Sequence, residues 1–227
     1  MSAAYIFDVE GTLIDCAPET LQCWHDTLAA FGVPVPLAHL QRLSGMDGDD
    51  MLATLVPSLD KKARKEIVTA EGERYRMLYL PRARAFPGVR EVFCAIKAHG
   101  GRIALATDCQ SAELKHYRSL IDVDDLLDAI ACGDEVSKGK PDPGLVELAL
   151  SHLGATSAGF ATMIGDTPFD AQAARSAGAT AWGTLSGGHP RSSLIDAGCS
   201  VVVSSVADFA RYFQREAAVA SSVSHQH

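Results

Sequence analysis

Two carboxylates follow directly after an apolar run near the start of the chain. Asp8 and Glu10 occur in "YIFDVEGT", where Gly11 and Thr12 come next. An aspartate at such a strand end can act as a nucleophile towards phosphorus. A second carboxylate beside it can move protons as a general acid or base. The residue types and their spacing therefore indicate a reacting centre at the end of the first strand.

Similar polar residues end later apolar runs or open the helices after them. Thr107 and Asp108 follow "RIALA", Lys140 lies in "SKGKPDP", Asp166 follows "FATMIG", and Asp170 comes one helical turn later. Carboxylates that share a cleft repel one another, and a hard cation such as Mg²⁺ relieves this repulsion. A threonine hydroxyl and backbone N–H groups at a strand–loop junction can hold a phosphate.

Each of these residues, taken alone, also has a purely structural explanation. Asp8 could cap a turn, Lys140 could be a surface charge, and Asp166 could cap a helix. Taken together, they occupy successive strand ends, and ligands of open α/β sheets bind at the carboxyl ends of the strands. Four coincidences at one sheet edge would be needed, so the pattern favours a catalytic site.

Continuous apolar runs predict the strands that must position these residues. They show little alternation, which is typical of a parallel sheet covered on both faces. The predicted strands span 4–9, 102–107, 160–165, 179–185 and 199–205. Helical patterns alternate with them at 87–100, 141–154, 168–178 and 205–219. This alternation predicts an α/β fold with a doubly wound parallel sheet.

A long helical stretch interrupts this alternation after the first strand. It carries no convincing strand and reads as helices at about 18–31, 36–43, 47–56 and 60–80. We therefore expect an α/β core domain made of residues 1–15 and 85–216. We expect a helical cap domain over 16–84, and a polar tail over 217–227 that is mobile.

The composition excludes several classes of protein. The net charge of −8 argues against nucleic-acid binding, which needs a basic surface. No run reaches the ~18 apolar residues of a membrane span, and the first residues lack the pattern of a signal peptide. We therefore expect a cytoplasmic enzyme with no membrane partner. The six cysteines form no C-x-x-C pair, so we expect buried, reduced thiols.

The motifs "DVEGT", "ATD", "GKPDP" and "GDTPFD" occur in this order. Together they resemble the haloacid-dehalogenase-like superfamily of hydrolases, which are mostly Mg²⁺-dependent phosphatases. The helical stretch is similar to the cap of phosphoglycolate-phosphatase-like and β-phosphoglucomutase-like members. The resemblance covers the chain except about its last dozen residues. It implies a Rossmann-like core and the hydrolysis of a small phosphorylated metabolite by a monomer or homodimer.

The resemblance also implies roles for single residues. Asp8 would be the nucleophile that becomes an aspartyl-phosphate. Glu10 would be the general acid and base, and its backbone carbonyl would bind Mg²⁺. Asp8, Asp166 and Asp170 would be the acidic residues of the metal site. Asp170 would bind the metal directly or through water, or would hold Lys140 in place.

The phosphoryl group would be held by further residues. Thr107 and the backbone amide of Asp108 resemble the phosphate-binding pair, and we expect Gly11 to bind substrate or phosphate with them. Lys140 resembles the lysine that steadies the phosphoryl oxygens, whereas Lys138 does not match that position.

Position 10 separates the chemistries of the superfamily. Members similar to the C–Cl dehalogenases have tyrosine there, and phosphonoacetaldehyde hydrolases have alanine, so Glu10 argues against both. Most phosphatases have aspartate, whose carboxyl reaches about 1.5 Å less far. Enolase-phosphatase-like members share a "D-x-E-G-T" start, so glutamate is compatible with hydrolysis. A phosphomutase ranks below a phosphatase, and a catalytically weakened binding protein remains a third possibility.

Substrate choice in capped members lies with cap residues that face the core. The stretch "QRLSGMDGDDML" at 41–52 is the strongest candidate, because Gly45 and Gly48 break a helical pattern. Arg42 could contact an anionic or hydroxylated leaving group, although a solvated surface arginine is an equal alternative. We therefore predict substrate contacts from Arg42 and Gly45.

Overall fold

Six parallel strands form the central sheet of the computed structural model, which describes residues 3–155 and 158–213. Their order is β5-β4-β1-β6-β7-β8. The strands are β1 (Ala4–Phe7), β4 (Arg102–Ala106), β5 (Ala129–Ala131), β6 (Ala161–Gly165), β7 (Thr180–Thr184) and β8 (Cys199–Val203). β1 pairs with β4 on one side and β6 on the other, in parallel register. The chain order therefore reverses at β1, which is where open α/β sheets bind ligands.

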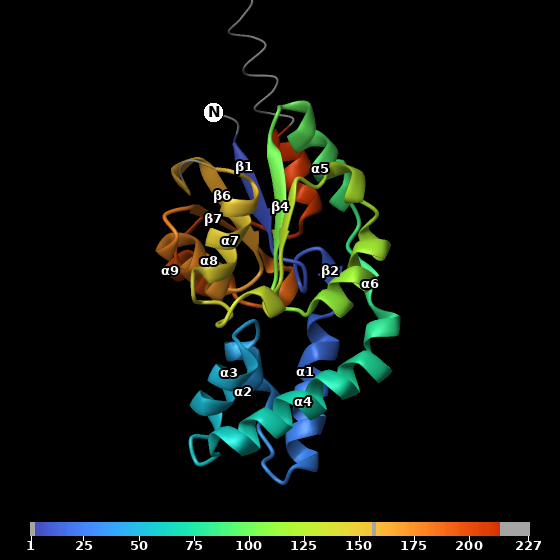
Figure 1. Cartoon of the computed structure of the whole chain (residues 1–227), viewed down its shortest axis with the longest axis vertical. Coiled ribbons are helices and arrows are strands. Elements are labelled where there is room, and N and C mark those ends of the chain that lie inside the picture. The colour runs from blue at the N-terminus through green and yellow to red at the C-terminus, as the bar shows by residue number, and fades with distance from the viewer. Residues whose placement is uncertain (1–2, 156–157, 214–227) are drawn as a thin grey trace, which may run out of the picture.

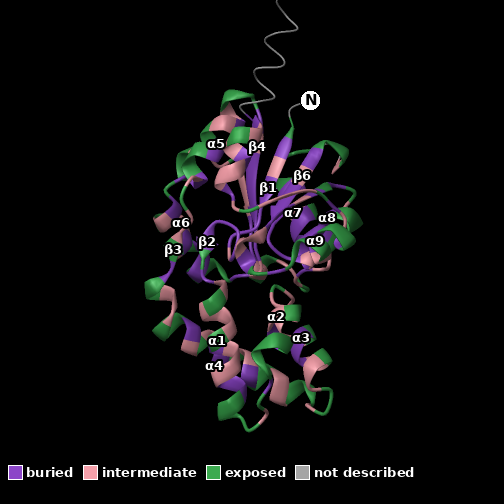
Figure 2. Ribbon diagram, turned by 180° about the vertical axis from the view of Figure 1, so that it is seen from behind, coloured by how far each residue is buried: buried purple, intermediate pink, exposed green. Residues whose placement is uncertain are grey.

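Alternate side chains of the strands enter two separate cores. Phe7 and Leu105 belong to the core on one face, while Ile6 and Ala104 belong to the core on the other. The first face is covered by α5 (Val89–Ala98), α6 (Ser111–Ile121) and a helix within residues 207–213. The second is covered by α7 (Gly144–His152), α8 (Pro168–Ser176) and α9 (Arg191–Ala197). Burial on both faces explains why the strands read as continuous apolar runs (Figure 2).

Four helices within residues 17–78 pack together below the carboxyl ends of the strands (Figure 1). They are α1 (Ala17–Ala30), α2 (Leu37–Leu43), α3 (Gly48–Leu55) and α4 (Lys61–Leu78). We call residues 17–78 the helical segment. Its own apolar cluster contains the fully buried Leu28, Leu40 and Leu52. Its helices begin and end within about two residues of the expected bounds.

The chain enters and leaves the helical segment through a short two-stranded ribbon. β2 (Ile14–Asp15) pairs antiparallel with β3 (Arg84–Ala85), with Asp15 opposite Arg84. Both crossings between the sheet and the helical segment therefore lie side by side.

Several elements were not anticipated from the sequence. β5 is only three residues long, which is too short for a clear periodic signal. α6 carries buried residues at Leu114, Tyr117 and Ile121, a helical spacing hidden among charged side chains. α9 was also missed. Of the expected helix at 205–219, the described residues 207–213 are helical; its remainder and the expected tail at 217–227 lie outside the described residues.

Candidate active site

Asp8 and Asp166 lie at the carboxyl ends of the neighbouring strands β1 and β6. The backbone N–H of Asp8 donates to the carbonyl of Ile164 at 2.9 Å, which continues the strand pairing by one residue. Their side chains are buried, with 5% and 3% of each residue exposed. Two acids are thus held close together where the strand order reverses.

Lys140 lies among three aspartates. Its Nζ is 2.5 Å from Oδ1 of Asp8, 2.7 Å from Oδ1 of Asp170 and 3.4 Å from Oδ2 of Asp108. Its backbone N–H donates to Oδ1 of Asp108 at 3.0 Å. Lys140 is buried, whereas Lys138 is exposed. The structure therefore brings Lys140, and not Lys138, into the acidic cluster.

The start of α8 fixes Asp170. Oδ2 of Asp170 accepts hydrogen bonds from the hydroxyl and the backbone N–H of Thr167 at 2.7 and 3.0 Å. This reciprocal arrangement is a capping box, and Pro168 occupies the first helical position. Because its other oxygen accepts from Lys140, Asp170 connects the helix start to the lysine.

Three neighbours shape the surroundings of Asp166. The Thr12 hydroxyl donates to its Oδ1 at 2.7 Å. A Cβ on Gly11 or Gly187 would come within 2.5 or 1.6 Å of its Oδ2, so only glycine fits at either position. Gly11 was expected near the site, but Gly187 was missed. No motif marks Gly187, because the turn after β7 reaches Asp166 only in the folded chain.

The acidic cluster carries more negative charge than its lysine offsets. Burial raises the pKa of Asp8 well above its ordinary range, Lys140 opposes this rise, and Asp170 and Asp166 add to it. Burial, together with the charge of Asp170, raises the pKa of Asp166 to about 7. Burial opposes the charged form of Lys140, but the neighbouring aspartates raise its pKa well above its usual value. Another cation would relieve the remaining repulsion.

The geometry of the acids fits a hard divalent cation. One carboxylate oxygen from each of Asp8, Asp166 and Asp170 lies within 4.8 Å of the others. Carboxylates and backbone carbonyls are the ligands that Mg²⁺ prefers. Because both oxygens of Asp170 already accept hydrogen bonds, Asp8 and Asp166 are the stronger ligand candidates.

The two predicted phosphate-binding residues after β4 differ in whether they line the cavity. Asp108 lines the cavity above the cluster, but Thr107 is not among the lining residues. Thr107 is almost fully buried, and its hydroxyl accepts a hydrogen bond from the backbone N–H of Cys109 at 3.3 Å. In this bond the Thr107 hydroxyl only accepts and keeps its own proton to donate, so phosphate binding by Thr107 stays a prediction.

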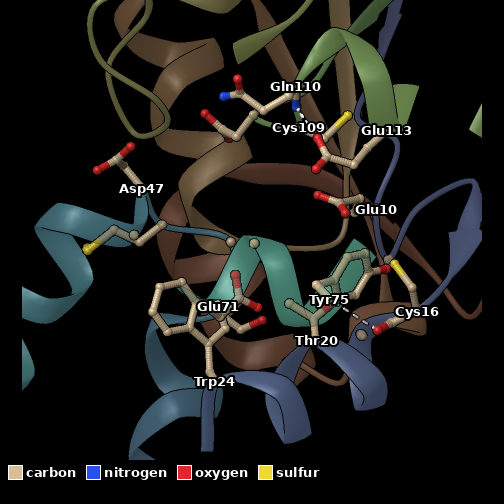
Figure 3. A pocket seen from close by; sticks show the side chains of 18 of the residues that line it. Glu10, Cys16, Thr20, Trp24, Asp47, Glu71, Tyr75, Cys109, Gln110 and Glu113 are labelled. Atoms are coloured by element: carbon tan, nitrogen blue, oxygen red, sulfur yellow. Dashed lines mark hydrogen bonds between the residues drawn. The ribbon is translucent and has the colours of Figure 1, made fainter. Parts of the chain in front are cut away.

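A cavity of about 470 Å³ lies between the sheet edge and the helical segment (Figure 3). Its floor includes Asp8, Glu10 and Lys140. Trp24, Glu71 and Tyr75 of α1 and α4 line it from the helical side. This volume is in the range of small-molecule sites.

The loop between α2 and α3 closes one side of the cavity. Gly45 has φ of +87°, and a Cβ there would lie 2.4 Å from Cγ2 of Thr167, so the loop touches the start of α8. The Asp47 N–H donates to the carbonyl of Lys140 at 3.3 Å. Gly45 thus lies where it was expected. Arg42 does not: it is exposed and does not line the cavity, because it faces outward at the end of α2.

Glu10 lies beside the cluster and is held from behind. Its Oε1 accepts a hydrogen bond from the hydroxyl of Tyr117, on α6, at 2.7 Å. Burial raises the pKa of Glu10, and the bond from Tyr117 lowers it in part. A carboxyl group with a raised pKa is suited to donate a proton. Tyr117 was not predicted as a site residue, since α6 itself was missed.

Within residues 3–155 and 158–213, no lysine or arginine other than Lys140 forms an ion pair with an aspartate of the cluster. Arg82 lies just before β3 and Arg84 lies within it, and both are exposed. Five of the six cysteines are buried, whereas Cys94 is exposed, and all six are free thiols. Among the described residues, no helix is both long and apolar enough to cross a bilayer.

A family model described as haloacid dehalogenase-like hydrolase matches residues 5–183. The chain therefore belongs to this family, as the four motifs indicated. Within this family its sequence resembles phosphoglycolate phosphatases, and its fold resembles that of a putative β-phosphoglucomutase.

Curated relatives match nearly the whole chain. A phosphoglycolate phosphatase of Nitrosospira multiformis is 27% identical, over 93% of this chain and 96% of the relative. A phosphorylated carbohydrates phosphatase of Thermotoga maritima is 26% identical, over 88% of this chain and 93% of the relative. The crystal structure of a hydrolase from Pseudomonas syringae is 27% identical, with a TM-score of 0.86 over 94% of this chain and 99% of that one.

Proposed function

We propose that this protein hydrolyses a small phosphomonoester through an aspartyl-phosphate formed on Asp8. The observation that carries the proposal is the cluster at the cavity floor. There Oδ1 of Asp8 lies 2.5 Å from Nζ of Lys140. One carboxylate oxygen from each of Asp8, Asp166 and Asp170 lies within 4.8 Å of the other two. A nucleophile, a cation for the phosphoryl oxygens and a metal-binding acid pair are the parts that phosphoryl transfer requires.

The class of reaction follows from the family. The chain is a phosphatase of the haloacid dehalogenase-like hydrolases, a class supported by several curated relatives that bear this name. The names of these relatives give phosphoglycolate or phosphorylated carbohydrates as their substrates. A cavity of about 470 Å³ accommodates ligands of this size. We therefore propose a small phosphorylated metabolite as substrate.

Asp8, the carbonyl of Glu10 and Asp166 would hold a Mg²⁺ ion, and Asp170 would support them through Lys140. When bound, the ion would offset negative charge on the phosphoryl oxygens. Lys140 would also offset this charge, because its ammonium already lies against Asp8. Asp170 holds that ammonium in place through its own ion pair at 2.7 Å.

In the first step an oxygen of Asp8 attacks phosphorus, and the bond from phosphorus to the leaving oxygen breaks. Protonated Glu10 gives its proton to the leaving oxygen, so the product departs as an alcohol. The raised pKa of Glu10 supports this role, because more of the group is protonated at neutral pH. The enzyme then carries an aspartyl-phosphate and a glutamate carboxylate.

In the second step Glu10 takes a proton from a water molecule, whose oxygen attacks phosphorus. The bond between phosphorus and the oxygen of Asp8 breaks, and inorganic phosphate leaves. Asp8 is again a carboxylate and Glu10 is again protonated, so the cycle balances. Both steps use one carboxyl group, which must therefore stay close to phosphorus throughout.

We further propose that residues 16–84 act as a cap domain on a core of 1–15 and 85–216. The paired crossings at β2 and β3 give the segment a narrow connection, and the loop at Gly45 closes on α8. Closure would exclude bulk water before the first step, and opening would release the product.

The experiment compares the purified protein and Asp8→Asn on p-nitrophenyl phosphate and a panel of phosphorylated metabolites, with Mg²⁺ and with EDTA. We expect hydrolysis by the wild type with Mg²⁺, little with EDTA, and none by the variant. Hydrolysis by Asp8→Asn at the wild-type rate would contradict the proposal. Halide release from haloacids without metal would point instead to dehalogenation.

A further inference from the structure

The carboxyl group of Glu10 is the first member of a chain of three side chains. Its Oε1 accepts from the Tyr117 hydroxyl at 2.7 Å, and the hydroxyls of Tyr117 and Tyr75 lie 2.8 Å apart. A Tyr117 hydroxyl that donates to Glu10 must accept from Tyr75, since each hydroxyl has one proton. Tyr75 therefore donates to Tyr117, and Tyr117 donates to Glu10.

The three members come from three different parts of the fold. Glu10 follows β1, Tyr117 lies on α6 against the sheet, and Tyr75 lies on α4 of the helical segment. The bond between the two tyrosines therefore crosses the boundary between the sheet and the helical segment. It would form only when α4 lies against α6, as it does in this structure.

The two tyrosines stand in different relations to the cavity. Tyr117 is fully buried and does not line the cavity, so it contacts Glu10 from behind. Tyr75 is 6% exposed, and Figure 3 shows its ring beside Cys16, on the side of the cavity where Glu10 lies. Tyr117 is therefore placed to orient Glu10 without touching a substrate.

An ion pair holds the same boundary one turn away. Arg76 follows Tyr75 on α4, and its Nη1 lies 3.0 Å from Oε1 of Glu113, four residues before Tyr117 on α6. Oε2 of Glu113 accepts from the backbone N–H of Gln110, which fixes the glutamate at the start of α6. α4 and α6 thus meet through two adjacent polar contacts.

We propose that Tyr117 and Tyr75 are positioning residues that place the carboxyl group of Glu10 for proton transfer when the helical segment closes on the sheet. The inference rests on the proposed function, because it assigns Glu10 the proton. It adds that the helical segment, through Tyr75, helps to hold the carboxyl group that donates the proton. Closure then not only excludes water but also aligns the general acid.

The same contacts account for glutamate at position 10. An aspartate carboxyl would end about one C–C bond, or roughly 1.5 Å, short of its present place. A separation of 2.7 Å would then open beyond hydrogen-bond distance. The longer side chain is the one that reaches Tyr117 from this backbone position.

The test uses the need of the leaving group for a proton. An alkyl phosphate has a poor leaving group that requires a general acid, whereas p-nitrophenyl phosphate has a good one that requires little help. The ratio kcat/KM covers the steps up to loss of the leaving group. The alkyl phosphate is the one that the wild type hydrolyses with the highest kcat/KM in the metabolite panel. We expect Tyr117→Phe to lower kcat/KM for this substrate by about 10- to 100-fold, and for p-nitrophenyl phosphate by less than about 3-fold.

Tyr75→Phe serves as the second variant, since it leaves the direct bond between Tyr117 and Glu10 intact. We expect a smaller loss with the same substrate selectivity. Tyr79→Phe is the matched control, because its ring stacks on Tyr75 at 6.1 Å and it does not line the cavity. We expect Tyr79→Phe to match the wild type on both substrates.

The outcomes distinguish a failure of this inference from a failure of the proposed phosphatase function. Activity of Asp8→Asn would overturn the proposed function itself. If Asp8→Asn is inactive but Tyr117→Phe and Tyr75→Phe lose equal activity on both substrates, or none, the positioning role is wrong while the phosphatase mechanism stands. If Tyr117→Phe fails to fold, by circular dichroism, the substrate selectivity of Tyr75→Phe alone decides in the same way.

Discussion

At the scale of single residues, the site depends on groups whose reach is fixed by the backbone. Asp8 meets Lys140, and Glu10 meets Tyr117, each through one short contact. A side chain shorter by one C–C bond would lose either contact. Substitutions that shorten Asp8 or Glu10 should therefore lower activity more than substitutions away from the site.

Glu10→Asp tests this reach. We expect kcat/KM for an alkyl phosphate to fall by about 10- to 100-fold, because the carboxyl group loses Tyr117 and moves from its place. Glu10→Gln, which keeps the length but has no proton to give, is the comparison and should fall at least as far. A Glu10→Asp enzyme faster than the wild type would show that the pocket is not built around the longer side chain.

Gly187→Ala tests the space around Asp166. A Cβ at position 187 would come within 1.6 Å of Oδ2 of Asp166, so the carboxylate must move. Since Asp166 is a proposed metal ligand, we expect a several-fold higher Mg²⁺ concentration for half-maximal activity. Thermal unfolding in EDTA serves as control, and an unchanged Mg²⁺ requirement in a folded variant would argue against Asp166 as ligand.

Much of the site could be predicted at this scale, because the motif residues follow strand ends that the sequence displays. Asp8, Asp166, Asp170 and Lys140 do converge. Arg42 is exposed and does not line the cavity, since a helical pattern alone does not say which way the end of α2 faces. Long-range contacts such as Gly187 to Asp166 left no local signal in the chain.

At the scale of elements, α4 and α6 form the junction through which the helical segment is linked to Glu10 by hydrogen bonds. α6 was not predicted, although Gln110 and Glu113 form a capping box at its start. The capping pair was overlooked because it uses glutamine rather than serine or threonine as first residue. Tyr117, whose hydroxyl donates to Glu10, was therefore missed together with its helix, whereas α4, which carries Tyr75, was predicted.

Glu71 on α4 provides a prediction about stability. Burial raises its pKa to about 8, the neighbouring Cys23 thiol opposes this rise, and Glu10 and Glu113 add to it. The ordinary value is 4.5, so between about pH 4.5 and pH 8 the folded state binds more protons than the unfolded state. The free energy of unfolding contributed by this group therefore falls as pH rises through that window.

Glu71→Gln removes this dependence. We expect the variant to gain stability relative to the wild type as pH increases from 5 to about 8.5, measured by denaturant unfolding. Glu73→Gln is the control, because Glu73 is an exposed glutamate on the same helix. A difference between wild type and Glu71→Gln that stays constant with pH would mean that Glu71 is not held in its protonated form.

At the scale of the whole molecule, the structure is closed on two sides of the cavity. One side is the junction of α4 with α6, and the other is the loop of Ser44, Gly45 and Asp47 against the sheet edge. There the carbonyl of Ser44 lies 3.1 Å from Nε2 of His189. Gln41 adds a hydrogen bond to the carbonyl of Gly187 at 3.2 Å. The order of sheet and helical segment was predictable, but this two-sided closure was not, because it depends on contacts between distant residues.

Gly45→Ala tests the closure. Its Cβ would lie 2.4 Å from Thr167, which should hold the loop away from α8 and lower kcat/KM by at least about 10-fold. Gly32→Ala is the matched control, since Gly32 also has positive φ but no atom within 4 Å of a Cβ. Equal losses in the two variants would attribute the effect to backbone strain rather than to closure.

The central claim is that Asp8 carries the phosphoryl group, and trapping that group tests it most directly. The wild type is mixed with Mg²⁺ and a radiolabelled phosphomonoester, quenched with acid within one turnover, and digested for peptide mapping. We predict a labelled peptide that contains Asp8, and no label in Asp8→Asn. Turnover without any labelled protein, together with activity of Asp8→Asn, would contradict the account.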